Sequence, residues 1–99
     1  MVNRIAICDD VEVERFVLKR QLMVYFQTNG REAQIQEYES GESLLADIEE
    51  GYIWPDLIFL DIYMGDLNGM DTARKLRDLG VKAPIVFLTA SPAFALVMR

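Results

Sequence analysis

Three aspartates and one threonine stand at positions that suit chemistry. Asp9 and Asp10 follow one short apolar run, Asp61 ends a second, and Thr89 ends a third. The chain contains no histidine, which excludes the usual histidine-activated nucleophiles and histidine-based metal sites. Carboxylates are therefore its obvious reactive groups.

The placement of these aspartates predicts a metal site. If the apolar runs are parallel strands, their carboxyl ends meet at one edge of the sheet, where such folds bind ligands. Three carboxylates crowded together repel one another unless a hard cation with oxygen ligands lies among them. We expect Mg²⁺, held by Asp9 and Asp10.

A phosphorylated species is the expected second ligand of this metal, because Mg²⁺ in proteins commonly shares its coordination shell with phosphate oxygens. Asp61 ends the most apolar run and is the best-placed nucleophile, so it would form an aspartyl phosphate. The Thr89 hydroxyl would donate a hydrogen bond to a phosphoryl oxygen, and the small side chain of Ala90 would leave room for the group.

Each of these residues also has a purely structural interpretation. Asp10 alone is more often a helix N-cap than a metal ligand. Asp61 alone can simply end a strand, and Thr89 is a common type of strand residue. The complete set favours function, because several carboxylates crowded together without partners are costly to the fold.

The apolar pattern predicts strands and helices in alternation. Short continuous runs predict strands at 3–8, 33–38, 56–61 and 84–89, with 33–38 at an edge and 56–61 in the centre. Helical spacing predicts helices at 11–28, 40–51 and 70–79, and a further helix that begins at Ser91-Pro92. This order predicts an open, doubly wound α/β fold with a parallel sheet.

Composition narrows the class of protein. Ninety-nine residues with 52% hydrophobic side chains describe one small domain over 1–99, and a net charge of −6 argues against direct binding of nucleic acid. The N-terminus lacks the apolar stretch of a signal peptide or a membrane span. With one cysteine, Cys8, in an apolar run, we expect a reduced thiol, a cytoplasmic location and no membrane partner.

These motifs together resemble the receiver domain of bacterial two-component response regulators. The similar segments are Ile5-Ala6-Ile7-Cys8-Asp9-Asp10, Phe59-Leu60-Asp61-Ile62-Tyr63-Met64, Val86-Phe87-Leu88-Thr89-Ala90 and the loop glycine Gly69. Details around Asp61 and Gly69 are similar to regulators that carry a LytTR-type DNA-binding output domain, which is absent from this chain.

The resemblance implies a flavodoxin-like fold and a set of roles. A sensor histidine kinase would donate a phosphoryl group to Asp61, with Mg²⁺ bound by Asp10, Asp61 and the backbone carbonyl of Tyr63, and with Asp9 assisting. Thr89 would move toward the phosphoryl group and switch a transcriptional output. The domain would assist its own phosphoryl transfer and dephosphorylation without being a classical enzyme.

The sequence departs from the family in two ways. Gly65 stands where the family usually has proline, which should loosen the loop. The family's fifth strand, its phosphoryl-binding lysine and its last helix would all lie beyond Arg99, so we expect strand 84–89 to be an unpaired edge. Weak phosphorylation and homodimers, formed by pairing of exposed edges or by exchange of the terminal helix, are the expected consequences.

Other classes of protein compete with this interpretation. Tyr63 argues against a haloacid-dehalogenase-type phosphatase, which needs an acid at this position. The absence of glycines directly after the first strand excludes a nucleotide-binding Rossmann domain. A receiver-like interaction or dimerisation module that works without phosphorylation stays open. Extra apolar residues in helix 11–28 suit either a docking kinase helix or packing under neighbouring helices. They are Phe16, Val17, Met23, Val24 and Phe26.

Overall fold

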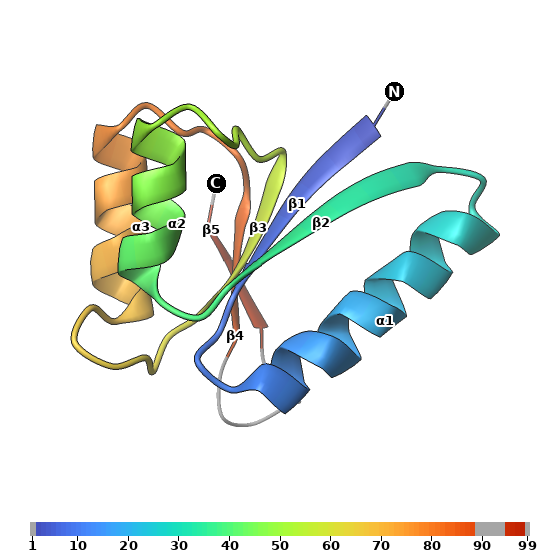
Figure 1. Cartoon of the computed structure of the whole chain (residues 1–99), viewed down its shortest axis with the longest axis horizontal. Helices are drawn as coiled ribbons and strands as arrows, with labels where there is room; N and C mark the ends of the chain where they lie inside the picture. The colour runs from blue at the N-terminus through green and yellow to red at the C-terminus, as the bar shows by residue number, and fades with distance from the viewer. Residues whose placement is uncertain (1, 89–94, 99) are drawn as a thin grey trace.

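Continuous apolar runs fold into strands that helices cover on both faces (Figure 1). The computed structural model describes residues 2–88 and 95–98. Its elements, in chain order, are β1 (Val2–Cys8), α1 (Glu12–Thr28), β2 (Glu32–Tyr38), α2 (Gly41–Glu49), β3 (Leu57–Asp61), α3 (Gly69–Asp78), β4 (Ile85–Leu88) and β5 (Ala95–Met98).

The sheet has the strand order β2-β1-β3-β4-β5, in which the first four strands are parallel. The predicted doubly wound α/β architecture is confirmed, with β2 at one edge and β3 in the centre. Because β1 and β3 are neighbours, their carboxyl ends lie side by side. The residues that follow β1 therefore come next to the last residue of β3.

Two hydrophobic clusters occupy the two faces of the sheet. Ile5 and Ile7 of β1 pack with Phe26 of α1 on one face. Alternate residues of the same strands point to the other face, under α2 and α3. There they form the larger cluster, whose strand members are Ala6, Cys8, Tyr38, Ile58, Leu60, Ile85 and Phe87. Burial on both faces explains why these strands are apolar at consecutive positions.

The expected helix after Ser91-Pro92 is wrong where the structure can test it. Residues 95–98 form β5, which pairs antiparallel with β4, from Leu88 opposite Ala95 to Ile85 opposite Met98. The β4 edge offers unpaired backbone groups beside an apolar face, and this tertiary demand overrides the helical preference of the segment. The expected unpaired edge at β4 is therefore also wrong, while the predicted helix start lies outside the described residues.

Helix α1 begins one residue later than predicted and has an unusually apolar surface. Its N-cap is Val11, and no side chain caps it, so the interpretation of Asp10 as the cap is wrong. Among the apolar residues that widen its surface, Phe26 is in the core, whereas Phe16, Val17, Met23 and Val24 are exposed. No helix in the described ranges is long and apolar enough to cross a membrane.

The start of α3 packs directly against the end of β3. The Gly69 amide donates a hydrogen bond to the Ile62 carbonyl at 2.9 Å, and Asn68 caps the helix by accepting from the Asp71 amide. A Cβ at position 69 would collide with the Asp61 carbonyl oxygen and lie 2.8 Å from the Ile62 Cα. Position 69 therefore requires glycine, because no side chain fits between α3 and the end of β3.

We predict that Gly69→Ala lowers the free energy of unfolding by about 1–3 kcal/mol, because the added methyl group must push the backbone of β3 away. Urea denaturation followed by circular dichroism measures this. Gly65→Ala is the matched control, since nothing lies within 4 Å of its Cβ position. Equal stability losses in the two variants would contradict the steric explanation.

Candidate functional site

Asp9 leaves the end of β1 with its backbone held on several sides. Its amide donates to the Tyr38 carbonyl at 3.0 Å, and its own carbonyl accepts from Arg15 Nη1 at 2.7 Å. The side chain is 2% exposed, and Oδ1 accepts from the Val11 amide at 2.9 Å. These contacts fix a nearly buried carboxylate at the carboxyl edge of the sheet.

Asp61 ends β3 and begins the loop that leads to α3. Its Oδ1 accepts a hydrogen bond from the Tyr63 amide at 3.1 Å. The loop is anchored beneath by Met64, whose Sδ lies 3.6 Å from the Sγ of the buried Cys8. Burial raises the pKa of that thiol to about 12, so it is a packing group and not a nucleophile at neutral pH.

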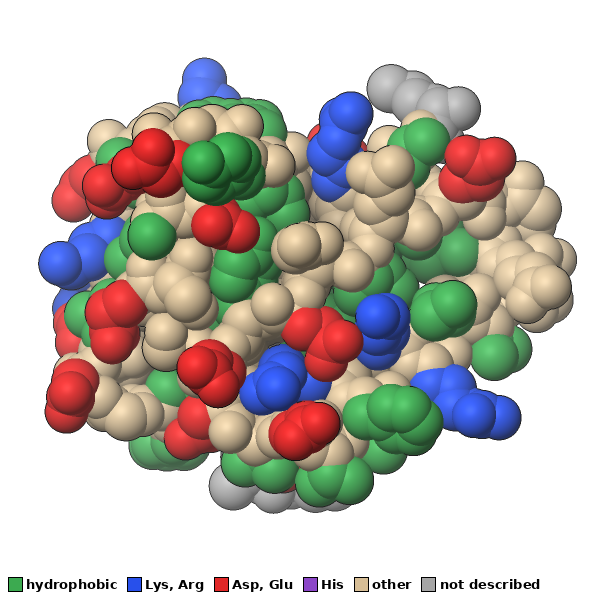
Figure 2. Space-filling model, in the orientation of Figure 1, with side chains coloured by type: hydrophobic (Ala, Val, Ile, Leu, Met, Phe, Trp, Pro, Cys, Tyr) green, Lys and Arg blue, Asp and Glu red, His purple; other side chains and the backbone are tan. Residues whose placement is uncertain are grey.

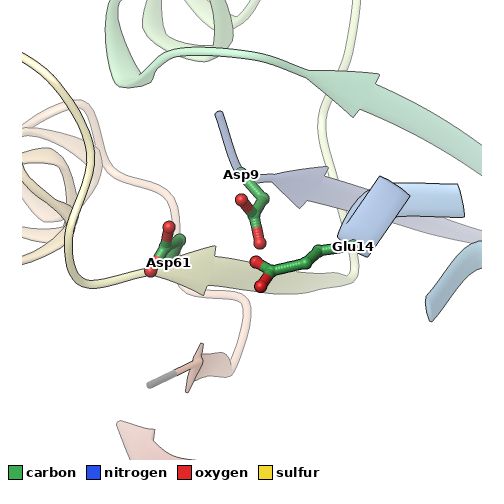
Figure 3. Close-up of side chains that lie close together, drawn as sticks. All are labelled: Asp9, Glu14 and Asp61. Carbon is green, nitrogen blue, oxygen red and sulfur yellow. The ribbon is translucent and has the colours of Figure 1, made fainter. Parts of the chain in front are cut away.

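Three carboxylates from three elements converge at this edge, as Figure 3 shows. Asp9 follows β1, Asp61 ends β3, and Glu14 lies in the first turn of α1. One carboxylate oxygen from each lies within 4.8 Å of the others. Oxygen donors in such a group suit a hard divalent cation such as Mg²⁺.

The side chains predicted for the site divide into three groups. Asp9 and Asp61 are brought together. Asp10 is exposed and lies outside the group of oxygens within 4.8 Å. Thr89 and Ala90 lie outside the described residues.

Burial and the neighbouring carboxylates both disfavour the charged form of Asp61. Desolvation is the largest cause that raises the pKa of Asp61. The Tyr63 amide hydrogen bond lowers this pKa, the charges of Asp9 and Asp10 raise it, and the net value is about 6. Asp10 thus acts on Asp61 through its charge. Asp9 also raises the pKa of Glu14, through a shared hydrogen bond and then through charge.

Two residues near the site were not predicted from the sequence. An acidic first turn in α1 is visible there, but a carboxylate in that position also fits the helix dipole. Only the docking of α1 over the strand ends shows that Glu14 faces the aspartates. Arg15 supplies a cation beside them: it is 14% exposed, and its Nε lies 3.4 Å from Glu37 Oε1.

Comparison with known proteins identifies the family. A family model described as the response regulator receiver domain matches residues 5–99. This chain belongs to the response regulator receiver domains. Receiver domains are signalling domains of two-component systems.

Relatives and a solved structure agree with this assignment. The receiver domain is 31% identical to the sensory transduction protein LytT of Bacillus subtilis over 93 residues, which cover 94% of this chain and 36% of LytT. It is 27% identical over 88 residues to the transcriptional regulatory protein YdfI of the same organism, covering 89% of this chain and 38% of YdfI. The chain therefore spans little more than a third of either relative.

The solved structure is the response regulator TrrA of Thermotoga maritima in complex with Mg²⁺-BeF. It superimposes with a TM-score of 0.73 at 32% identity, over 92% of this chain and 72% of that one. The likeness supports the flavodoxin-like receiver fold. The match to LytT agrees with the similarity to LytTR-type regulators that the sequence indicates.

We predict that Asp61→Asn stabilises the receiver domain above pH 6 when no divalent cation is present. A carboxyl whose pKa is raised in the fold contributes stability below its unfolded pKa, and this contribution is lost as the pH rises through the folded value of about 6. The variant should therefore gain roughly 1 kcal/mol at neutral pH and nothing below about pH 4.

Thermal unfolding in a chelating buffer across this pH range measures the difference. Asp66→Asn, a change at an exposed loop aspartate, is the control and should show no such pH-dependent gain. A constant gain at all pH values for Asp61→Asn would contradict the raised pKa of Asp61 as its cause.

Proposed function

We propose that this receiver domain accepts a phosphoryl group on Asp61 from a sensor histidine kinase, in a reaction that depends on Mg²⁺, and thereby switches a transcriptional output. The observation that carries the proposal is the convergence of Asp9 and Glu14 on Asp61. A fold gains nothing from crowding three carboxylates, so their arrangement calls for a function.

The donor set fits a magnesium ion. All its side-chain ligands would be carboxylate oxygens, and the cluster combines a nearly buried Asp9 with an exposed Glu14. We propose Asp9 and Asp61 as ligands, together with Asp10 and the backbone carbonyl of Tyr63. The structure adds Glu14 as a candidate, so that either Glu14 or Asp10 would be the third carboxylate ligand. When bound, the ion would supply positive charge that offsets the phosphoryl oxygens.

Asp61 does the covalent chemistry in this proposal. One of its carboxylate oxygens attacks the phosphorus of a phosphohistidine, the phosphorus–nitrogen bond breaks, and its electron pair stays on the imidazole nitrogen. The Tyr63 amide, which donates to Asp61 Oδ1, holds the carboxylate in place. Thr89 would donate a hydrogen bond to the phosphoryl group, and the domain would assist its own dephosphorylation.

We place the exchange in the cytoplasm, where the buried thiol of Cys8 stays reduced. The output would be a downstream DNA-binding domain of LytTR type, as the likeness to LytT suggests, with no nucleic acid or membrane bound by the receiver domain itself. We also propose a homodimer, which the exposed apolar side chains of α1 support.

We predict that Mg²⁺ raises the melting temperature of the wild-type domain, because it relieves the repulsion among the carboxylates. Glu14→Gln and Asp10→Asn separate the two candidate third ligands, since only loss of a true ligand weakens the response. Replacing one carboxylate ligand should reduce magnesium affinity roughly ten-fold or more. Calorimetric titration measures it, with Asp66→Asn as the control, and unchanged affinity in Asp9→Asn would contradict the proposed site.

We predict one phosphoryl adduct when the chain is incubated with a small acyl phosphate and Mg²⁺. The adduct should be absent from Asp61→Asn and sensitive to hydroxylamine, because an acyl phosphate is a mixed anhydride. Intact-mass spectrometry measures it. Absence of an adduct from this chain and also from a longer chain that contains it would favour an interaction module that works without phosphorylation.

A further inference from the structure

Strand β2 is a seven-residue edge strand whose only charged side chains are Glu32 and Glu37. Within the described residues it pairs only with β1, from Val2–Glu32 to Cys8–Tyr38. Its seven residues contain no proline and no lysine, which are common means of preventing pairing between edge strands. At the opposite edge of the sheet, β5 pairs with β4 and covers it.

A groove lies beside this free edge on the face that carries α1. It has a volume of about 390 Å³ and is lined by Phe16, Met23 and Val24 together with Lys19, Arg20 and Glu37. The three apolar side chains are 54–60% exposed, although Phe, Met and Val are usually buried in protein cores. Figure 2 shows apolar side chains exposed over the half of the molecule that contains α1, interspersed with basic ones.

A second groove lies beside the edge on the opposite face. It has a volume of about 410 Å³, with Arg4, Gln34 and Gln36 on the sheet and Tyr52 and Trp54 on one wall. Tyr52 is 78% exposed and Trp54 is 51% exposed. Exposed apolar surface therefore flanks both faces of the same edge strand.

Net charge also favours this edge as the place where a second, equally acidic copy of the chain can approach. Residues 12–38 carry four acidic residues (Glu12, Glu14, Glu32, Glu37) and four basic residues (Arg15, Lys19, Arg20, Arg31), a net charge of zero. The whole net charge of −6 therefore belongs to the rest of the chain. Figure 2 shows the acidic side chains concentrated over the half that contains α2 and α3.

We propose that a second copy of this chain pairs with β2 in antiparallel orientation, which joins the two sheets and packs the two α1 helices against each other across a two-fold axis. With Ile35 on the axis, Glu32 lies opposite Tyr38, Ala33 opposite Glu37, and Gln34 opposite Gln36. No like charges are opposed in this register. Each copy's α1 then covers the other's groove, as a two-fold interface requires.

This surface specifies the homodimer proposed above and does not depend on phosphorylation. A second copy suits the edge better than an extended peptide, because a lone peptide strand would pair with β2 and leave Phe16, Met23 and Val24 exposed. A second copy also brings its own α1, which lies on the same face of the joined sheet. It also brings two Gln34–Gln36 pairs whose amides can hydrogen-bond to each other.

The test uses two oppositely charged double variants of the 99-residue chain. Gln34→Lys with Gln36→Lys places like charges opposite one another in the dimer, and so does Gln34→Glu with Gln36→Glu. Both positions are exposed, so the fold should tolerate the changes. Each variant alone should dimerise roughly ten-fold or more weakly than the wild type, and an equimolar mixture should recover the affinity as a heterodimer.

Sedimentation velocity over a range of concentrations measures these affinities. Gln21→Lys with Glu49→Gln is the control for the lysine variant, because it changes the net charge by the same amount at exposed positions that line neither groove. It should dimerise as the wild type does. A wild-type chain that stays monomeric at every concentration overturns the proposal. So does a dimer that both charged variants retain, or a mixture that fails to recover affinity.

Phosphoryl transfer to Asp61 in the same variants separates this inference from the proposed function. Normal adduct formation with weakened dimers supports the surface and leaves the phosphoacceptor role intact. Loss of the adduct in the wild-type chain, with charge-dependent dimers still present, overturns only the phosphoacceptor role. A monomeric wild-type chain that binds a synthetic extended peptide at β2 would identify that peptide class as the occupant and overturn the second copy.

Discussion

Parallel pairing of β1 with β3 is the constraint on which the site depends. The register from Ile5–Leu57 to Cys8–Leu60 makes both strands end at the same level, so that Asp9 and Asp61 emerge side by side. Apolar residues on both faces of these strands hold the register, because a slip of one residue would exchange the two faces. The core that stabilises the fold thereby also fixes the distance between the carboxylates.

The same pairing imposes a cost at the edge of the sheet. Desolvation, together with the charges of Asp9 and Asp10, raises the pKa of Asp61 to about 6, so ionised Asp61 opposes folding near neutral pH. The surrounding contacts hold it in place nevertheless: Met64 packs on Cys8 beneath the loop, and Gly69 allows α3 to press against the end of β3. The fold thus maintains an arrangement that its carboxylates alone would disperse, and a bound cation would relieve that strain.

The sequence predicted whatever depends on local pattern. Apolar runs revealed the four parallel strands, and the rule that their carboxyl ends share an edge placed Asp9 and Asp61 together. Glu14 could not be placed in the same way, because its position depends on how α1 docks and not on the helix itself. For residues 95–98 the local pattern predicted a helix, and only the unpaired β4 edge explains why they form a strand.

The two edges of the sheet show how one physical demand can have two solutions. Both β2 and β4 would expose a row of backbone donors and acceptors beside apolar surface. At β4 the chain satisfies them with its own β5. At β2 no described segment does so, yet the surrounding charge is balanced, whereas the rest of the chain is strongly acidic. A balanced edge within an acidic molecule favours association there, because two copies that meet elsewhere would bring net negative charge together.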